Sequence, residues 1–98
     1  MDYDLVPAAP PAVFRDDQAR VNLTFMGGNG DLPDAVSVDV TDVELKTMLV
    51  EALRAGDIPG LPASPAADLS LFKVDRFPPT DVRPYRLIQV RPKTELGA

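Results

Sequence analysis

The residue types that most often perform chemistry in proteins are missing from this sequence. The 98 residues include no Cys and no His, which excludes disulfides, thiolate metal sites, cysteine nucleophiles and the commonest general base. Catalysis would have to rest on carboxylates, Lys, Tyr, Ser or Thr, and no clustered set of these appears along the chain. We therefore expect a protein that is bound or attached to something, without a cofactor, and not an enzyme.

Two segments look superficially like ligand sites. The run Gly27-Gly28-Asn29-Gly30 has the composition of a phosphate-binding loop, but it lacks the following Lys-Ser/Thr and helix N-terminus that such loops need. Asp31, Asp34 and Asp39 lack the spacing and the closing Glu of a calcium loop. We interpret the first segment as a turn and expect no metal site in the second.

Basic side chains gather in the last quarter of the chain. They are Lys73, Arg76, Arg83, Arg86, Arg91 and Lys93. If the strand that contains Lys73 lies close to the last strand, these charges surround Leu71 or Leu87 and form the apolar centre with a polar rim that is typical of protein-binding surfaces. We predict a protein-binding face that consists of Leu71, Lys73, Arg86 and Leu87, with ordinary solvated strand faces as the alternative interpretation.

The overall charge and the apolar runs restrict the partners further. A formal net charge of −5 argues against nonspecific nucleic-acid binding, which needs a basic surface. The N-terminal residues lack the basic start and apolar core of a signal peptide, and no apolar run approaches the roughly 18 residues of a membrane helix. The sequence thus predicts a cytoplasmic location without nucleic-acid or membrane partners.

The first secondary-structure elements that the sequence predicts form a hairpin. Val21, Leu23 and Phe25 alternate with polar or exposed positions, as in a half-buried strand. Residues 27–31 tolerate positive φ and are expected to form a longish loop. A second alternating run over residues 36–41 is expected to complete the hairpin.

The helix carries the clearest local signals. Thr41 and Glu44 have the spacing of a capping box, and Gly56 is suited to a left-handed C-cap. Between them the apolar residues repeat every three or four positions on one face. Those residues are Leu45, Met48, Leu49, Ala52 and Leu53.

The rest of the chain alternates between breaks and strands. Residues 60–65 read as a loop, residues 68–74 as a strand rich in Leu, Phe and Val, and residues 86–91 as a last strand with Ile88 and Val90 facing inward. Pro78, Pro79 and Pro84 interrupt the chain between these two strands. We assign residues 1–18 to a flexible acidic Pro/Ala-rich extension, 19–92 to one folded domain and 93–98 to a flexible tail.

This order of elements resembles ubiquitin and its β-grasp relatives, and the resemblance covers about residues 20–97. The hairpin runs into a capped helix as in that family, and Asp57-Ile58-Pro59 sits where ubiquitin carries a similar Gly-Ile-Pro turn. The resemblance implies an α+β fold, a ubiquitin-like β-grasp with a mixed four- to five-stranded sheet packed on one main helix.

The resemblance also implies a function for the tail. In the family a flexible Arg-containing tail ends in Gly-Gly, whose carboxylate is adenylated and attached to a lysine or to sulfur. Here a single glycine, Gly97, is followed by Ala98, so a peptidase would first have to remove Ala98. Such trimming is similar to the precursor processing of ubiquitin-like modifiers, including those encoded in bacterial conjugation-like operons.

The implied partners are an adenylating activating enzyme, conjugating enzymes, a processing peptidase and a target protein. A residue without Cβ passes most easily through a narrow enzyme channel, which suits Gly97, and Arg91, Lys93 and Leu96 are expected to take part in tail recognition. The free protein is expected to be a monomer. The first alternative is a noncovalent β-grasp adaptor that binds a partner through its sheet face or a sheet edge. The second alternative is a small acidic inhibitor whose N-terminal extension occupies a basic site.

Overall fold

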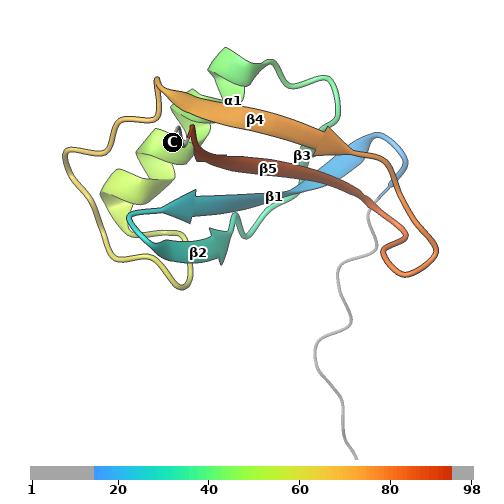
Figure 1. The fold of residues 1–98 in the computed structure, drawn as a ribbon, viewed down its shortest axis with the longest axis horizontal. Coiled ribbons are helices and arrows are strands. Elements are labelled where there is room, and N and C mark those ends of the chain that lie inside the picture. Colours follow the sequence, from blue (N-terminus) through green and yellow to red (C-terminus); the bar gives the residue numbers. More distant parts are fainter. Residues whose placement is uncertain (1–14, 94–98) are drawn as a thin grey trace, which may run out of the picture.

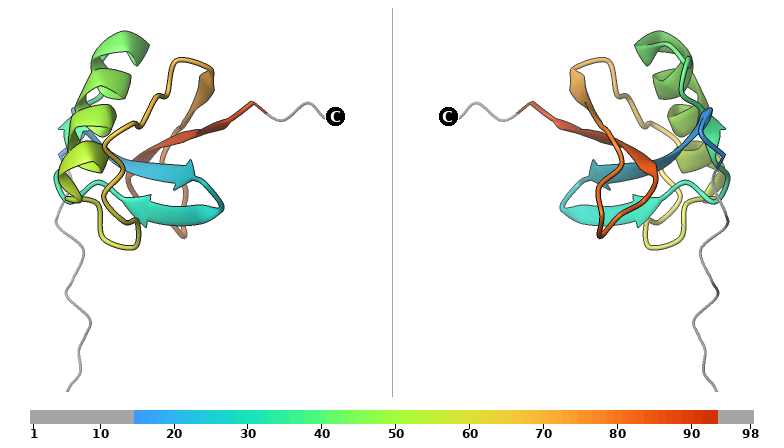
Figure 2. Two further views of the ribbon diagram at one scale, coloured as in Figure 1. Left: turned by 90° about the vertical axis from the view of Figure 1, so that its left-hand side faces the viewer. Right: turned by 90° about the vertical axis from the view of Figure 1, so that its right-hand side faces the viewer.

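The computed structural model describes residues 15–93, which form five strands and one helix. In chain order these elements are β1 (Gln18–Phe25), β2 (Gly28–Asp31), β3 (Val36–Ser37), α1 (Asp42–Ala55), β4 (Phe72–Phe77) and β5 (Arg86–Pro92). Helix α1 lies across one face of the sheet, and among the described residues no helix covers the other face (Figure 2). The predicted α+β class is confirmed.

The sheet is mixed because its two inner strands run parallel. The strand order is β2-β1-β5-β4, and β3 pairs with the start of β1 (Figure 1). Val21 of β1 lies beside Ile88 of β5 in the parallel pair, whereas the other strand pairs are antiparallel. This arrangement, which the sequence pattern left open, is compatible with a β-grasp.

Alternating side chains of the inner strands meet the apolar face of α1. Strand β1 buries Ala19, Val21 and Leu23, and β5 buries Ile88 and Val90, so the inward orientation predicted for the last strand is confirmed. The helix contributes Leu45, Leu49 and Leu53, each at most 1% exposed. Spacings of four residues place these three leucines on one side of the helix.

Both predicted caps of α1 are present. The Glu44 amide donates to the Thr41 hydroxyl at 3.1 Å, and the Thr41 amide donates to the Glu44 carboxylate at 3.0 Å. At the other end Gly56 adopts φ 74°, a left-handed conformation that is strained for residues with a Cβ. The helix therefore begins and ends where the sequence signals indicated.

The predicted loop over residues 27–31 is wrong. Met26 and Gly27 form a tight turn, and Gly28–Asp31 is strand β2. The predicted second strand over residues 36–41 shrinks to Val36–Ser37. The glycines of β2 serve close packing, because a Cβ at Gly30 would lie 2.9 Å from Ile58 Cγ2 and one at Gly28 would lie 2.8 Å from Leu61 Cδ2.

The strand predicted over residues 68–74 starts later, at Phe72. The Asp68 carboxylate accepts a hydrogen bond from the Ser70 amide at 2.9 Å, and the Phe72 amide donates to the Leu69 carbonyl at 3.0 Å. These local bonds form turns instead of a sheet ladder. Leu69 is nevertheless buried, at 1% exposure, because the loop inserts it into the core.

The described part of the chain begins three residues before β1. Gln18, assigned from sequence to the N-terminal extension, is the first residue of β1 and pairs with Ser37. The residues ahead of it also contact the domain, since the Val38 amide donates to the Asp17 carbonyl and Arg86 Nε donates to the Asp16 carbonyl. Residues 1–14 and 94–98 lie outside the described residues.

Candidate protein-binding site

The four residues predicted to form a binding face lie at two ends of the β4–β5 pair. Lys73 pairs with Arg91 and Phe77 pairs with Leu87. Lys73 and Phe77 are four positions apart along β4, a distance of about 13 Å. Arg86 and Leu87 lie at one end of the pair, where successive residues of β5 point to opposite faces of the sheet, and Leu71 and Lys73 lie near the other end.

The Lys73 end is dominated by one shared carboxylate. Asp75 Oδ2 lies 2.9 Å from Arg91 Nη2 and 3.7 Å from Lys73 Nζ, on the sheet face opposite the helix. Leu71, just before β4, is 79% exposed. Asp75 neutralises part of the predicted basic face, so the charges there are already paired within the strand pair.

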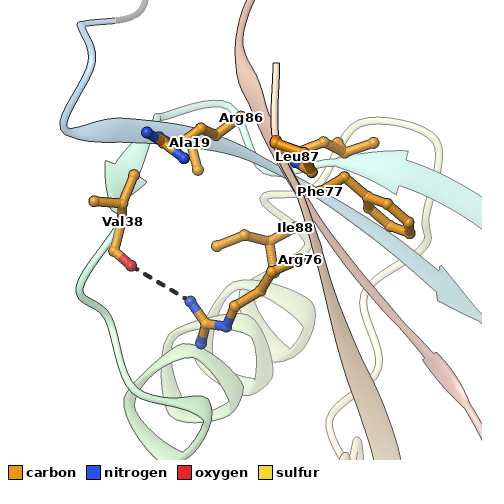
Figure 3. Close-up of a pocket in the computed structure, with 8 residues that line it drawn as sticks. Ala19, Val38, Arg76, Phe77, Arg86, Leu87 and Ile88 are labelled. Atoms are coloured by element: carbon orange, nitrogen blue, oxygen red, sulfur yellow. Dashed lines mark hydrogen bonds between the residues drawn. The ribbon is translucent and has the colours of Figure 1, made fainter. Parts of the chain in front are cut away.

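The Arg86 end contains a pocket of about 280 Å³ (Figure 3). Strand β5 supplies Arg86, Leu87 and Ile88, the end of β4 supplies Arg76 and Phe77, and Pro78 follows directly after β4. Ala19 of β1 and Val38, which follows β3, complete the lining. Most of these side chains are apolar, so the pocket offers a small hydrophobic surface with two guanidinium groups on it.

The two arginines of the pocket differ in their partners. Arg76 donates to the Val40 carbonyl at 2.9 Å, to the Asp42 carboxylate at 2.7 Å and, at 3.5 Å, to the Val38 carbonyl drawn in Figure 3. Arg86 donates through Nε to the Asp16 carbonyl at 3.2 Å, and within residues 15–93 no carboxylate pairs with it. Arg86 is therefore the group in this pocket that can receive an anionic partner atom.

Sequence reasoning missed half of this pocket. Phe77 is not among the residues predicted to form the binding face, and Val38 lies within the second strand predicted over residues 36–41. Phe77 is 37% exposed and pairs with Leu87, so the two side chains form a small apolar patch at the edge of the sheet. The signal available in the sequence was the apolar Phe77-Pro78 pair directly after Arg76.

The open face of β1 and β2 is polar and internally bonded. Asn22 Nδ2 donates to Asp31 at 2.7 Å and to Asn29 at 2.9 Å, and Arg20 lies 3.2 Å from Asp31. The Arg20 guanidinium also lies 5.2 Å from the centre of the Tyr85 ring. This half of the sheet face presents hydrogen-bonding groups whose partners are supplied largely by one another.

The predicted tail residues fall at the boundary of the described chain. Arg91 is paired with Asp75, and Lys93 is exposed one residue after β5. Leu96, Gly97 and Ala98 lie outside the described residues. Within residues 15–93 no group of three or more carboxylate, His or Cys side chains could hold a metal ion, and no helix is long and apolar enough to cross a membrane.

A scan against protein-family models, a search of curated proteins and a search of solved structures each found no match. The class of this protein therefore follows from its own geometry. It is a small α+β domain with a mixed sheet packed on one helix and a basic, apolar pocket at one end of its inner strand.

Proposed function

We propose that this chain is a ubiquitin-like protein modifier of the cytoplasm, which is cleaved after Gly97 and then attached through the Gly97 carboxylate to a target protein. A peptidase would remove Ala98, and an adenylating enzyme followed by conjugating enzymes would carry the activated carboxylate. The folded domain performs no chemistry in this scheme. It supplies recognition, and Gly97 supplies the reacting group.

The observation that carries this proposal is the position of β5. This strand lies between β1 and β4, and it is paired with β1 as far as Val90 and with β4 as far as Pro92. The chain therefore leaves the domain from a strand held on both sides, close to Arg91 and to the exposed Lys93. Enzymes that act at Gly97 could bind these basic residues without disturbing the hydrophobic core of the domain.

The second candidate function is a noncovalent adaptor, and the pocket at Arg86 favours it. The half-buried Val38 offers apolar contact near Arg86 there (Figure 3), while Arg86 has no carboxylate partner among residues 15–93. A partner that inserts an apolar side chain beside a carboxylate would match both features. Binding of this kind needs no free glycine carboxylate.

One experiment separates the two functions. Tagged wild type, Gly97→Ala, Ala98→Ser and Arg86→Glu are expressed in the native host and analysed by denaturing gel and by native pull-down. Conjugation predicts higher-mass adducts that disappear in Gly97→Ala and persist in Ala98→Ser, because Ala98 is removed before attachment. Adducts that are absent from wild type, or that survive Gly97→Ala, contradict conjugation through this residue. Partner capture that survives Gly97→Ala but is lost in Arg86→Glu would instead support the adaptor.

A further inference from the structure

A second concave surface lies along α1, beside the segment that precedes the helix. Two adjoining hollows of about 520 and 470 Å³ share Ala35, Val36 and Met48 and together form one groove between the helix and residues 32–40. Its helical wall extends from Glu44 to Ala55, which corresponds to about 17 Å at 1.5 Å per residue. No residue that lines the pocket at Arg86 also lines this groove, so the groove is a separate surface.

The floor of the groove is apolar and contains an accessible methionine. Leu32, Ala35, Val36, Val40, Ala52 and Ala55 line it with Met48. Met48 lies in the middle of the groove and is 40% exposed, although it belongs to the same apolar repeat of α1 as the buried leucines. Flexible, polarizable methionines adapt to the side chains of binding partners. The groove thus offers a hydrophobic surface that the described chain leaves open.

The rim of the groove carries carboxylates of one sign. They are Asp34, Asp39, Glu44, Glu51 and Asp57, and no Lys or Arg of the described chain lines either hollow. The residues that line the groove therefore carry five negative charges and no positive one.

Four of these carboxylates lack an ion-pair partner. Within residues 15–93 no salt bridge involves Asp34, Asp39, Glu51 or Asp57, whereas Asp31, Asp42 and Asp75 elsewhere are each paired with a cation. Glu44 is held by the Thr41 amide and hydroxyl, hydrogen bonds that lower its pKa and keep it ionised. The unpaired charges face solvent around an apolar floor.

We infer that this groove receives a basic amphipathic segment of a partner protein, with Lys or Arg side chains on both flanks of apolar ones. The apolar side chains would contact Met48 and Val36, and the cations would reach the rim carboxylates. Nucleic acids and anionic membranes share the sign of the rim and are repelled by it. The occupant is thus a polypeptide, and it is recognised by a surface independent of Gly97.

The test uses a fluorescein-labelled synthetic peptide in which Lys and Leu alternate with helical spacing, titrated with the full chain at low salt. Two double variants have the same net charge: Asp34→Asn with Asp39→Asn in the rim, and Asp16→Asn with Asp81→Asn outside it. We expect the rim pair to weaken binding about three- to tenfold and the control pair less than about twofold, because exposed ion pairs contribute modestly and locally. Met48→Ala should weaken binding at unchanged net charge, whereas Met26→Ala, in the β1–β2 turn, should not.

Amide shift mapping with the same peptide locates the site. Shifts centred on residues 34–40 and 44–57 support the inference. Equal weakening by both double variants, shifts centred on β4 and β5, or no binding at millimolar peptide each overturn it. Self-association of the wild type that is abolished by the rim pair would also overturn it, since a second copy of the chain would then be the occupant.

Discussion

Arg76 on β4 donates to the carboxylate of Asp42 in the first turn of α1 at 2.7 Å, so one ion pair joins the outer strand of the sheet to the helix. The same guanidinium donates to the Val40 carbonyl at 2.9 Å. Arg76 therefore holds the segment that enters the helix against the edge of the sheet.

The first prediction concerns this contact. Arg76→Ala should lower the free energy of unfolding by about 1–2 kcal/mol, because it removes an exposed ion pair and a charge-assisted hydrogen bond to a carbonyl. Asp42→Ala removes the ion pair alone and should cost less than about 1 kcal/mol. Urea denaturation compares the two variants. Equal losses would mean that the Val40 carbonyl contact contributes nothing.

Leu49 tests the packing of the helix on the sheet. It is fully buried, so Leu49→Ala should cost about 2–5 kcal/mol through lost apolar contact and a residual cavity. Val43 on the same helix is 75% exposed, and Val43→Ala should change stability by less than about 0.5 kcal/mol. Thermal melts followed by circular dichroism provide the comparison. Similar melting temperatures for both variants would contradict the packing of α1.

Gly30 tests the contact between β2 and the loop after the helix. A Cβ at this position would collide with the Pro59 carbonyl oxygen and with Ile58, so Gly30→Ala should destabilise the domain by about 1–3 kcal/mol. Gly27 has φ 81° and open space around it, and Asn tolerates that conformation. Gly27→Asn is thus the mild control, and an equally mild Gly30→Ala would show that the loop can move away from β2.

These glycines also explain where prediction from sequence failed. The helix was predictable because its caps and apolar period depend on neighbours within four residues, as the Thr41–Glu44 pair illustrates. Strand β2 was not predictable, because Gly28 and Gly30 are selected by a loop about 30 positions away and otherwise signal a turn. Leu69 led to the opposite error, a strand predicted where the structure has a loop. Its side chain is buried, and the loop that contains it is as rich in apolar residues as a strand.

The candidate site was predictable in part for a related reason. Arg86 and Leu87 are neighbours in sequence and share the pocket. Leu71 and Lys73 belong to the far end of the same strand pair, a separation that depends on the antiparallel register of Lys73 with Arg91. The composition of the sequence shows that basic residues are present, but it does not show which residues of the two strands lie opposite each other.

The residues just ahead of β1 provide a fourth prediction. A protein that starts at Gln18 lacks the Asp17 carbonyl, which accepts from the Val38 amide, and the Asp16 carbonyl, which accepts from Arg86. Relative to a protein that starts at Arg15, it should lose about 1–2 kcal/mol of stability, since each hydrogen bond contributes about 1 kcal/mol. Chemical denaturation of the two truncated proteins measures the difference. Identical midpoints would contradict a stabilising role for this turn.

The capping box predicts a specific acid sensitivity. Hydrogen bonds from Thr41 lower the pKa of Glu44 below its ordinary value of 4.5. A lowered folded-state pKa means that this stabilisation is present above the unfolded-state value and is lost as the pH falls through the folded-state value. Glu44→Gln keeps a capping side chain but removes that titration, so its melting temperature should fall less steeply than that of the wild type below about pH 4.5. Parallel curves for both proteins down to about pH 2 would contradict this assignment.

The parallel pairing of β1 with β5 has a consequence for biosynthesis. All five partner pairs between these strands are 67 positions apart, and in the described chain β4 pairs with β5 alone. During translation every other element therefore emerges before the strand that joins β1 to β4. Until β5 emerges, Val21 and Leu23 have no strand beside them on that edge, and the nascent chain exposes an unpaired apolar strand of the kind that chaperones bind. Folding of this domain is consequently a late event in its synthesis, and a premature stop before Arg86 would leave an aggregation-prone fragment instead of a smaller domain.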